Sequence, residues 1–116
     1  MTTHARTDPT DLPLHEAAST FAALGSEQRL AVLRTLVRAG PDGLSIGELG
    51  ERTGITGSTL THHMRILTQA GLVNQTRQGR RILCVGAAYD RMHALSAFLL
   101  EECCADSLAG KAHIHG

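Results

Sequence analysis

Three cysteines are the residues of this chain with the most distinctive chemistry. Cys103 and Cys104 are adjacent near the end of the chain, and Cys84 lies upstream in a short apolar run. Thiolates are soft ligands, so they favour thiophilic metals or metalloids over hard cations. An odd number of cysteines without the spacing of a disulfide framework is typical of free thiols. The cysteines therefore predict a site that binds a thiophilic ion or responds to an oxidant.

The composition predicts one small domain. Of the 116 residues, 42% are hydrophobic and only 3% aromatic, so the core must consist mainly of Leu, Ile, Val and Ala. A small aliphatic core often gains stability by dimerising. The sequence shows no secretion signal and no apolar run of membrane-spanning length. We therefore expect a cytoplasmic protein that does not enter a membrane.

Charge is unevenly distributed along the chain although the net charge is zero. Residues 1–51 carry four arginines and seven acids, and residues 82–116 carry two basic and four acidic residues. Residues 52–81, between them, carry five arginines and no acid. A local basic block without acids is the electrostatic footprint of a nucleic-acid-binding face, although a merely solvated surface is the alternative.

Helix-forming stretches fill the first part of the chain. Residues 1–13 are polar and are predicted to be a disordered tail, and residues 14–24 form the first helix. Ser26 is suited to cap a second helix, because its hydroxyl can accept from free backbone amides. Residues 40–43, Gly-Pro-Asp-Gly, end that helix. Its buried face is predicted to contain Leu30, Leu33, Leu36 and Val37.

A helix-turn-helix pattern follows. Residues 45–48 have the Ser-x-x-Glu spacing of a capping box, which predicts a short helix to residue 53. Gly54 then tolerates a left-handed turn, and Thr56 is positioned to cap a further helix that reaches residue 70. The buried stripe of this helix is predicted to be Leu60, Met64 and Leu67.

A hairpin and a last helix complete the predicted domain. Residues 72–77 and 80–86 form two strands joined at Gln78–Gly79, and residues 88–104 form a helix. The fold class is mainly α with a β-hairpin: a winged helix-turn-helix with five helices and a two-stranded wing. Residues 14–104 are the DNA-binding and dimerisation domain, and residues 105–116 are a flexible tail.

The helix over residues 56–70 has the side chains that major-groove recognition requires, namely short polar groups and a cation on its outer face. Gly57 and Ser58 at its start let the backbone approach a phosphate. Basic residues on the hairpin suit phosphate or minor-groove contacts. Neighbouring helix positions point about 100° apart, so we expect His62 to face DNA and His63 to pack at the core edge rather than share a metal. The candidate DNA-binding residues are Gly57, Ser58, Thr59, Thr61, His62, Arg65, Arg77, Arg80 and Arg81.

Three segments of the chain resemble the ArsR/SmtB family of winged-helix repressors. They are residues 21–36, 44–73 and 77–86, and the most specific stretch is STLTHHMRILTQAGLV at residues 58–73. Residues 88–104 fit the C-terminal helix of that family. The resemblance implies a homodimer in which the first and last helices form the dimer face. It also implies that the protein binds double-stranded operator DNA without ligand and leaves it when a ligand binds.

The same resemblance points to the cysteines as the sensing site. Many family members bind metal through a cysteine-rich sequence in the helix before the recognition helix, but residues 45–53 contain no Cys or His. The run FLLEECC at residues 98–104 resembles arsenic-responsive members with a vicinal cysteine pair, although no third cysteine follows here. The expected effector is a trivalent arsenic species, with no permanent cofactor. Its expected ligands are Cys84, Cys103 and Cys104.

The number of converging thiols determines which arsenical binds. Inorganic arsenite or antimonite prefers three thiolates, whereas a monosubstituted arsenical such as methylarsenite needs two. Within one chain about 16 helical residues, roughly 25 Å, separate Cys84 from Cys103. Cys84 of one protomer could instead approach Cys103 or Cys104 of the other if the last helices pack antiparallel. The alternative for Cys84 is a buried strand residue that acts as a small hydrophobe.

Two other functions remain alternatives. One is a repressor that senses oxidants or sulfane sulfur by bridging Cys84 to Cys103 or Cys104. The other is a thiol-based metalloid-buffering protein or a small thiol enzyme. We expect that the protein is not an enzyme, because the sequence shows no catalytic Cys/His/Asp arrangement and no phosphate-binding loop. His113 and His115 near the C-terminus are either solvated or an additional borderline ligand pair.

Overall fold

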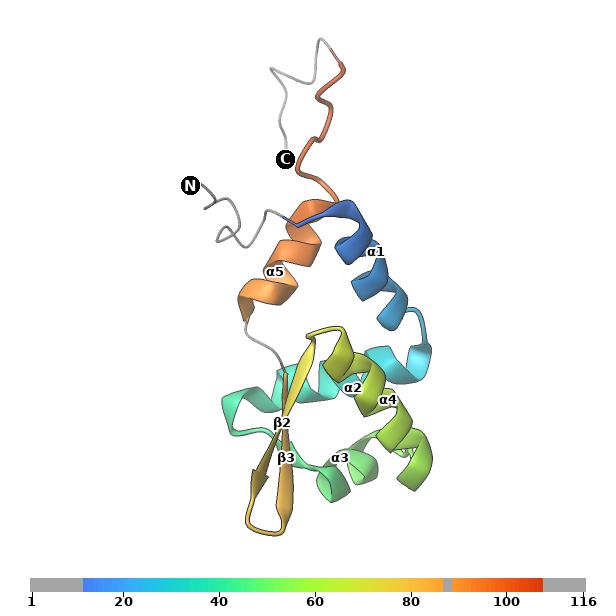
Figure 1. Cartoon of the computed structure of the whole chain (residues 1–116), viewed down its shortest axis with the longest axis vertical. Helices are drawn as coiled ribbons and strands as arrows, with labels where there is room; N and C mark the ends of the chain where they lie inside the picture. The colour runs from blue at the N-terminus through green and yellow to red at the C-terminus, as the bar shows by residue number, and fades with distance from the viewer. Residues whose placement is uncertain (1–11, 87–88, 108–116) are drawn as a thin grey trace.

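The computed structural model describes residues 12–86 and 89–107, and these form five α-helices and a small sheet. Figure 1 shows α2, α3, α4 and the sheet as one body, with α1 and α5 lying together beside it. The predicted winged helix-turn-helix is confirmed. The elements in chain order are α1 (Leu14–Ala23), α2 (Glu27–Ala39), the 3-10 turn η2 (Gly40–Asp42), β1 (Leu44–Ser45), α3 (Ile46–Thr53), α4 (Gly57–Gln69), β2 (Val73–Gln78), β3 (Arg81–Gly86) and α5 (Tyr89–Phe98).

The sheet is antiparallel and has the strand order β1-β3-β2. The hairpin register runs from Val73 opposite Gly86 to Gln78 opposite Arg81. The turn therefore lies at Gly79–Arg80, one residue later than predicted, and Gly79 adopts the positive φ of 66° that the turn requires. β1 was not predicted, because two residues are too short to show an alternating pattern.

The predicted helix cap is present at the start of α3 but not at the start of α4. The Ser45 hydroxyl accepts from the Glu48 amide at 3.1 Å, and Glu48 Oε1 accepts from the Ser45 amide at 2.8 Å. This reciprocal pair is the predicted capping box. Gly54 ends α3 in the left-handed conformation, as predicted. Thr56 occupies the N-cap position of α4, but its side chain makes no capping hydrogen bond.

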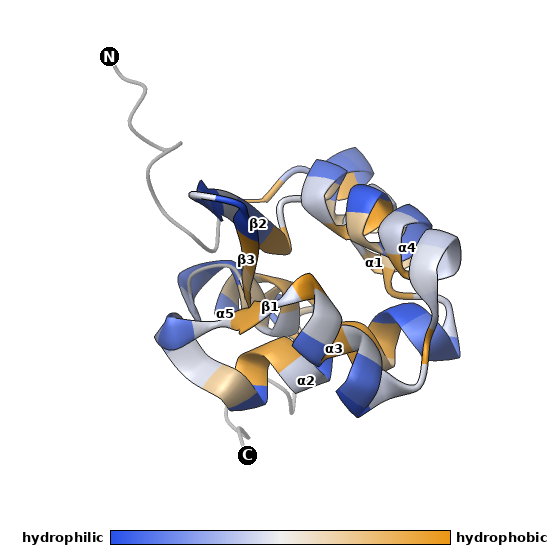
Figure 2. Cartoon of the chain, turned by 90° about the horizontal axis from the view of Figure 1, so that it is seen from below, coloured by the Kyte–Doolittle hydropathy of each residue, from blue (hydrophilic) through white to orange (hydrophobic). Residues whose placement is uncertain are grey.

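The core lies between α2, α3, α4 and the sheet, where Figure 2 shows hydrophobic colour on the facing sides of these elements. The predicted stripe of α4 is confirmed, with Leu60, Met64 and Leu67 at most 2% exposed. The predicted face of α2 is partly wrong. Leu30 and Val37 are 42% and 55% exposed, because the helix turns Val32 towards the core together with the predicted Leu33 and Leu36.

The last helix is shorter than predicted. α5 ends at Phe98, and the residues after it form a series of turns instead of continuing the helix to residue 104. Leu99 and Leu100 are 67% and 68% exposed, so packing among the described residues does little to support further helical turns. The predicted start at residue 88 and most of the two predicted tails lie outside the described residues. None of the described helices is long and apolar enough to cross a membrane.

A buried histidine joins α4 to α2. His63 is 7% exposed, and its Nε2 lies 2.8 Å from Gln28 Oε1. This position confirms the expectation that His63 packs at the core edge, and His62, which was expected to face DNA, is exposed to solvent. Burial, followed by the charges of Arg29 and His62, holds the pKa of His63 below its ordinary value of 6.5.

The lowered pKa of His63 predicts a loss of stability in mild acid. The unfolded chain protonates this histidine near its ordinary pKa of about 6.5, whereas the folded chain does so only at lower pH. As the pH falls below about 6.5, the unfolded state therefore binds more protons, and the free energy of unfolding decreases by up to about 1.4 kcal/mol per pH unit until the folded-state pKa is reached.

Urea denaturation between about pH 5 and 7.5 measures this effect. We expect His63→Gln to flatten the pH dependence of the unfolding free energy in this interval. His62→Gln, which removes the exposed neighbour, is the matched control and should leave the slope nearly unchanged. Equal flattening by the two substitutions would contradict a special role for His63.

Candidate nucleic-acid interface and thiol site

Packing of one face of α4 places its other face in solvent. Because Leu60, His63, Met64 and Leu67 are buried, the opposite face of α4 points away from the core. α4 thus presents to solvent all of its predicted DNA-binding residues, which are Gly57, Ser58, Thr59, Thr61, His62 and Arg65. The α3–turn–α4 unit has the order of a helix-turn-helix, with α4 as its second helix.

The start of α4 is suited to an anion. The Thr56 side chain does not cap the helix, and no acidic residue lies in the first turn. The first amides of α4 are therefore free of an intrahelical acceptor and face the solvent side, where a phosphate can bind them. The Thr61 hydroxyl donates to the Gly57 carbonyl at 3.2 Å, which leaves its oxygen available as an acceptor.

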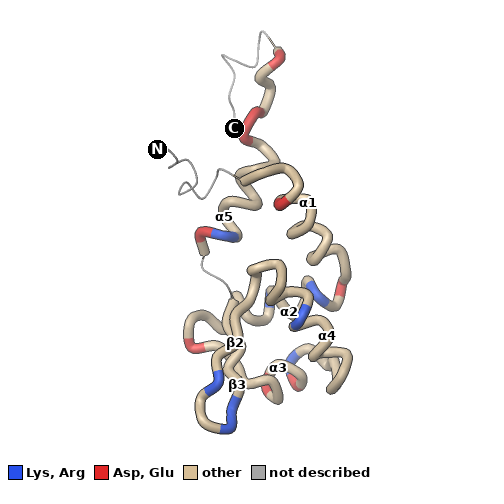
Figure 3. Tube along the Cα trace, viewed as in Figure 1, with Lys and Arg blue, Asp and Glu red and all other residues tan. Residues whose placement is uncertain are grey.

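The hairpin adds three exposed arginines, and Figure 3 shows them as the cationic end of the molecule. Arg80 lies in the turn itself. Arg77 Nη1 donates to the Gly79 carbonyl at 3.4 Å, which steadies the turn. Arg81 Nη2 lies 3.5 Å from Glu48 Oε1, so this side chain also ties the hairpin to α3.

Glu48 is held in its charged form by these neighbours. Hydrogen bonds from the Ser45 amide and then the Ser45 hydroxyl lower the pKa of Glu48, and the charges of Arg81 and Arg52 lower it further. The carboxylate therefore remains available to Arg81 and to the N-terminus of α3. An exposed ion pair of this kind contributes little stability, so its main consequence is to orient the hairpin.

A polar hollow of about 260 Å³ joins the recognition helix to the hairpin. It is lined by Arg65 and Thr61 of α4 and by Gln75 of β2, together with Thr68 and Gln69. The predicted site omitted Gln75, because nothing in the sequence indicates which face of β2 meets α4. The hollow makes the outer face of α4 and the hairpin one continuous polar surface.

The three cysteines occupy two different environments. Cys84 lies on β3 opposite Leu44 and Gln75 and is fully buried, and desolvation raises the pKa of its thiol. Cys103 and Cys104 are exposed in the turns after α5, with their Sγ atoms 3.5 Å apart. The neighbouring Cys104 thiol, through a hydrogen bond and then through its charge, raises the pKa of Cys103.

The structure brings two of the three predicted thiols together and leaves the third apart. β3 and the turns after α5 lie at opposite ends of α5 (Figure 1). Residues 12–86 and 89–107 contain no group of three or more Cys, His, Asp or Glu side chains that is placed to hold a metal. His113 and His115 lie outside these residues. Within one chain, a thiol site therefore consists of Cys103 and Cys104.

Comparisons with known proteins agree with this arrangement. A family model described as a helix-turn-helix domain matches residues 24–76. The chain is 41% identical over 63 residues to the uncharacterized HTH-type transcriptional regulator YceK of Bacillus subtilis, covering 54% of this chain and 62% of YceK. It is 34% identical over 68 residues to the HTH-type transcriptional regulator YgaV of Escherichia coli, covering 59% of this chain and 67% of YgaV.

A solved structure extends the similarity to most of the fold. An ArsR-like transcriptional regulator from Rhodococcus sp. RHA1 superposes with a TM-score of 0.65 and 28% identity, over 84% of this chain and 88% of the other. The family model thus matches residues 24–76, while the structural match covers a larger share of the chain. Together they show that the chain belongs to the ArsR family of winged-helix transcriptional regulators.

Proposed function

We propose that this protein is a dimeric repressor that binds double-stranded operator DNA and is released by a trivalent arsenical. The observation that carries the DNA-binding part is the polar surface described above, in which the outer face of α4 lies beside an arginine-rich hairpin. Arg65 and the short polar residues of α4 would read base edges in the major groove. Arg77 and Arg80 would contact phosphates, and Arg81 would do so while it is held by Glu48.

Dimerisation through α1 and α5 accounts for the apolar residues that these elements leave in solvent. Leu14 and Tyr89 at the starts of the two helices are 74% and 78% exposed, and Leu99 and Leu100 follow α5 with similar exposure. Leu14 and Leu99 border one hollow, and exposed apolar side chains on neighbouring elements are typical of an interaction surface. A second copy of the chain covering this surface would place two recognition helices on one DNA duplex.

The effector part of the proposal rests on the chemistry of the cysteine pair. The two Sγ atoms are 3.5 Å apart, so a single arsenic atom can bind both. A monosubstituted arsenical with two hydroxyl groups would exchange each hydroxyl for one thiol sulfur, releasing two waters, without any change in oxidation state. Because two thiols suffice for methylarsenite, Cys84 can remain in the core, and we assign it no part in ligand binding.

The geometry disfavours the redox alternative. The Cys103–Cys104 peptide bond is trans, which sets the Cα atoms about 3.8 Å apart. Disulfides usually span roughly 4.4–6.8 Å between Cα atoms, so a direct bond between these neighbours is strained. A bridge from either residue to Cys84 would first require the sheet to expose a fully buried thiol.

Arginine substitutions test the DNA interface. With a duplex selected by the wild-type protein from a random pool, we expect Arg65→Ala to weaken binding about tenfold or more, because a base contact contributes about 1–3 kcal/mol. Arg80→Ala should lower the slope of log affinity against log salt by about one, because one phosphate contact is lost. Arg34→Ala, on the exposed side of α2, is the control. Equal losses in all three variants, measured by fluorescence anisotropy, would contradict the interface.

Cysteine substitutions test the effector site. We expect methylarsenite to release the wild-type protein from its selected duplex and to bind one equivalent per chain by native mass spectrometry. Cys103→Ser and Cys104→Ser should each abolish both effects, because one thiolate cannot replace both hydroxyls. Cys84→Ala should retain both, since its thiol lies in the core. Loss of the response in Cys84→Ala alone, with a folded protein, would overturn the assignment.

A further inference from the structure

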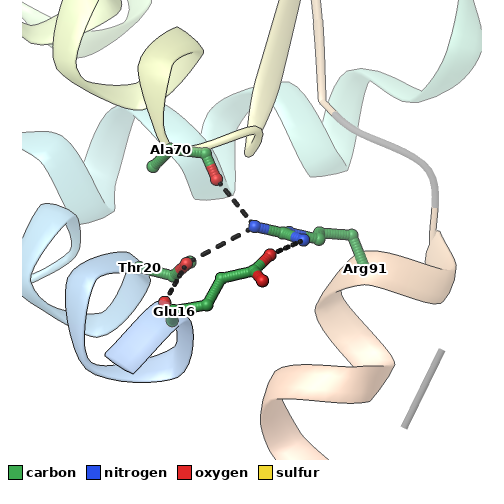
Figure 4. A network of polar contacts seen from close by, with 4 residues as sticks. All are labelled: Glu16, Thr20, Ala70 and Arg91. Carbon is green, nitrogen blue, oxygen red and sulfur yellow. Dashed lines mark hydrogen bonds and ion pairs between the residues drawn. The ribbon is translucent and has the colours of Figure 1, made fainter. Parts of the chain in front are cut away.

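An arginine of α5 reaches across the molecule to α1 and α4. Arg91 Nη1 donates to Glu16 Oε2 at 3.2 Å, and Nη2 donates to the Ala70 carbonyl at 3.1 Å and to Thr20 Oγ1 at 3.5 Å. Figure 4 shows its guanidinium between the side chains of α1 and the backbone at the end of α4. The side chain of one residue of α5 thus contacts two other helices that are far from it in the sequence.

The Ala70 carbonyl belongs to the end of the recognition helix. There the Leu72 amide donates to the Leu67 carbonyl and the Gly71 amide to the Thr68 carbonyl, which is a Schellman motif. Its glycine, Gly71, has a φ of 76°. The carbonyl of Ala70 points out of this motif and accepts from Arg91, where a cation also interacts favourably with the helix dipole.

The Arg91 guanidinium also packs against the backbone at Gly71, where the positive φ, and not a lack of space beside Arg91, favours glycine. A Cβ added at Gly71 would lie 3.5 Å from Arg91 Nη2 and 3.7 Å from Cζ and Nε, in direct van der Waals contact. The guanidinium therefore lies over the backbone at this glycine. Arg91 is also in the first turn of α5, where a positive charge is unfavourable to its own helix dipole. Its position is explained by its contacts with the other helices.

The partners of Arg91 are themselves fixed in place. Thr20 is 2% exposed, and its hydroxyl donates to the Glu16 carbonyl at 2.9 Å. A second arginine, Arg29 of α2, donates from Nε to the Ala23 carbonyl at the end of α1 at 2.6 Å. Arg29 therefore attaches α1 to α2, and Arg91 attaches α5 to both α1 and the end of α4.

We propose that Arg91 is a positioning residue that couples the α1–α5 layer to the recognition helix. A shift of α5 moves the guanidinium, and the end of α4 then loses a charge-assisted hydrogen bond and its packing over Gly71. Coupling of this kind is reciprocal, so a change at α4 also acts on α5. Its consequence for DNA affinity rests on the proposed function, whereas the coupling within the free protein does not.

Hydrogen exchange in the full-length free protein tests the coupling. We expect Arg91→Gln to speed amide exchange at residues 70–72 about tenfold, which is the loss of one hydrogen bond to a charged group, with little change at Leu33 and Leu36 in the core. Arg38→Gln removes the same charge from an exposed site on α2 and is the matched control. Arg91→Lys keeps the positive charge but loses the planar set of donors of the guanidinium. This variant replaces Arg91→Gln in the experiment if the glutamine variant does not fold.

A second substitution separates coupling from general stabilisation. Glu16 accepts a hydrogen bond from Arg91, and Figure 4 shows no interaction between Glu16 and Ala70, so Glu16→Gln should act on residues 70–72 only through Arg91. We expect it to speed their exchange in the wild-type background and to have no effect when Arg91 is already Gln. Equal effects in both backgrounds, or a uniform rise across all amides, would overturn the proposal.

DNA binding supplies an independent readout. For a duplex selected by the wild-type protein, we expect Arg91→Gln to weaken binding several-fold at a temperature where the variant is fully folded, with Arg38→Gln unchanged. Wild-type affinity in a fully folded Arg91→Gln protein would overturn the role in positioning α4 for DNA. If the wild-type protein selects no duplex, the proposed function fails, and the exchange experiment alone decides whether Arg91 couples the helices.

Discussion

The burial of one face of α4 is the constraint on which the rest of the structure depends. Leu60, Met64 and Leu67 are held against a core that includes Leu36 of α2 and Leu49 of α3. Because a helix repeats every 3.6 residues, fixing this face inward fixes Arg65 and its polar neighbours outward. The same core holds Val73 at the start of β2, so the hairpin begins where the recognition helix ends. The burial of this face of α4 thus positions both the outer face of α4 and the hairpin.

The α1–α5 layer is attached to this core by fewer contacts. Its links to the body formed by α2, α3, α4 and the sheet combine apolar side chains in the core cluster, Ala23 of α1 and Leu95 of α5, with the polar contacts of Arg29 and Arg91. Polar contacts depend strongly on geometry, so a small displacement breaks them where an apolar contact would adjust. The layer leads directly into the turns that carry Cys103 and Cys104. This arrangement would suit the proposed repressor, in which ligand binding at those thiols lowers the affinity for DNA.

The sequence predicted features governed by local chemistry and missed those that depend on distant partners. The capping box at Ser45, the stripe of α4 and the exposure of its outer face follow from spacing within a few residues. The length of α5 did not follow, because helix continuation after Phe98 requires packing that one chain does not supply. Arg91 was also missed, since its partner Glu16 is 75 residues away. A cation in the first turn of a helix was the only signal of a role elsewhere.

If ligand binding at the cysteine pair releases DNA through the dimer, it must change the placement of the two recognition helices. The most direct measurement is the distance between the two copies of residue 68, at the exposed end of α4, by pulsed electron spin resonance. The label should be attached through a noncanonical amino acid, which leaves all three cysteines free. We expect methylarsenite to shift this distance by about 2 Å or more, which is the size of helix shifts at other subunit interfaces. An unchanged distance in a dimer that has bound the arsenical would contradict it.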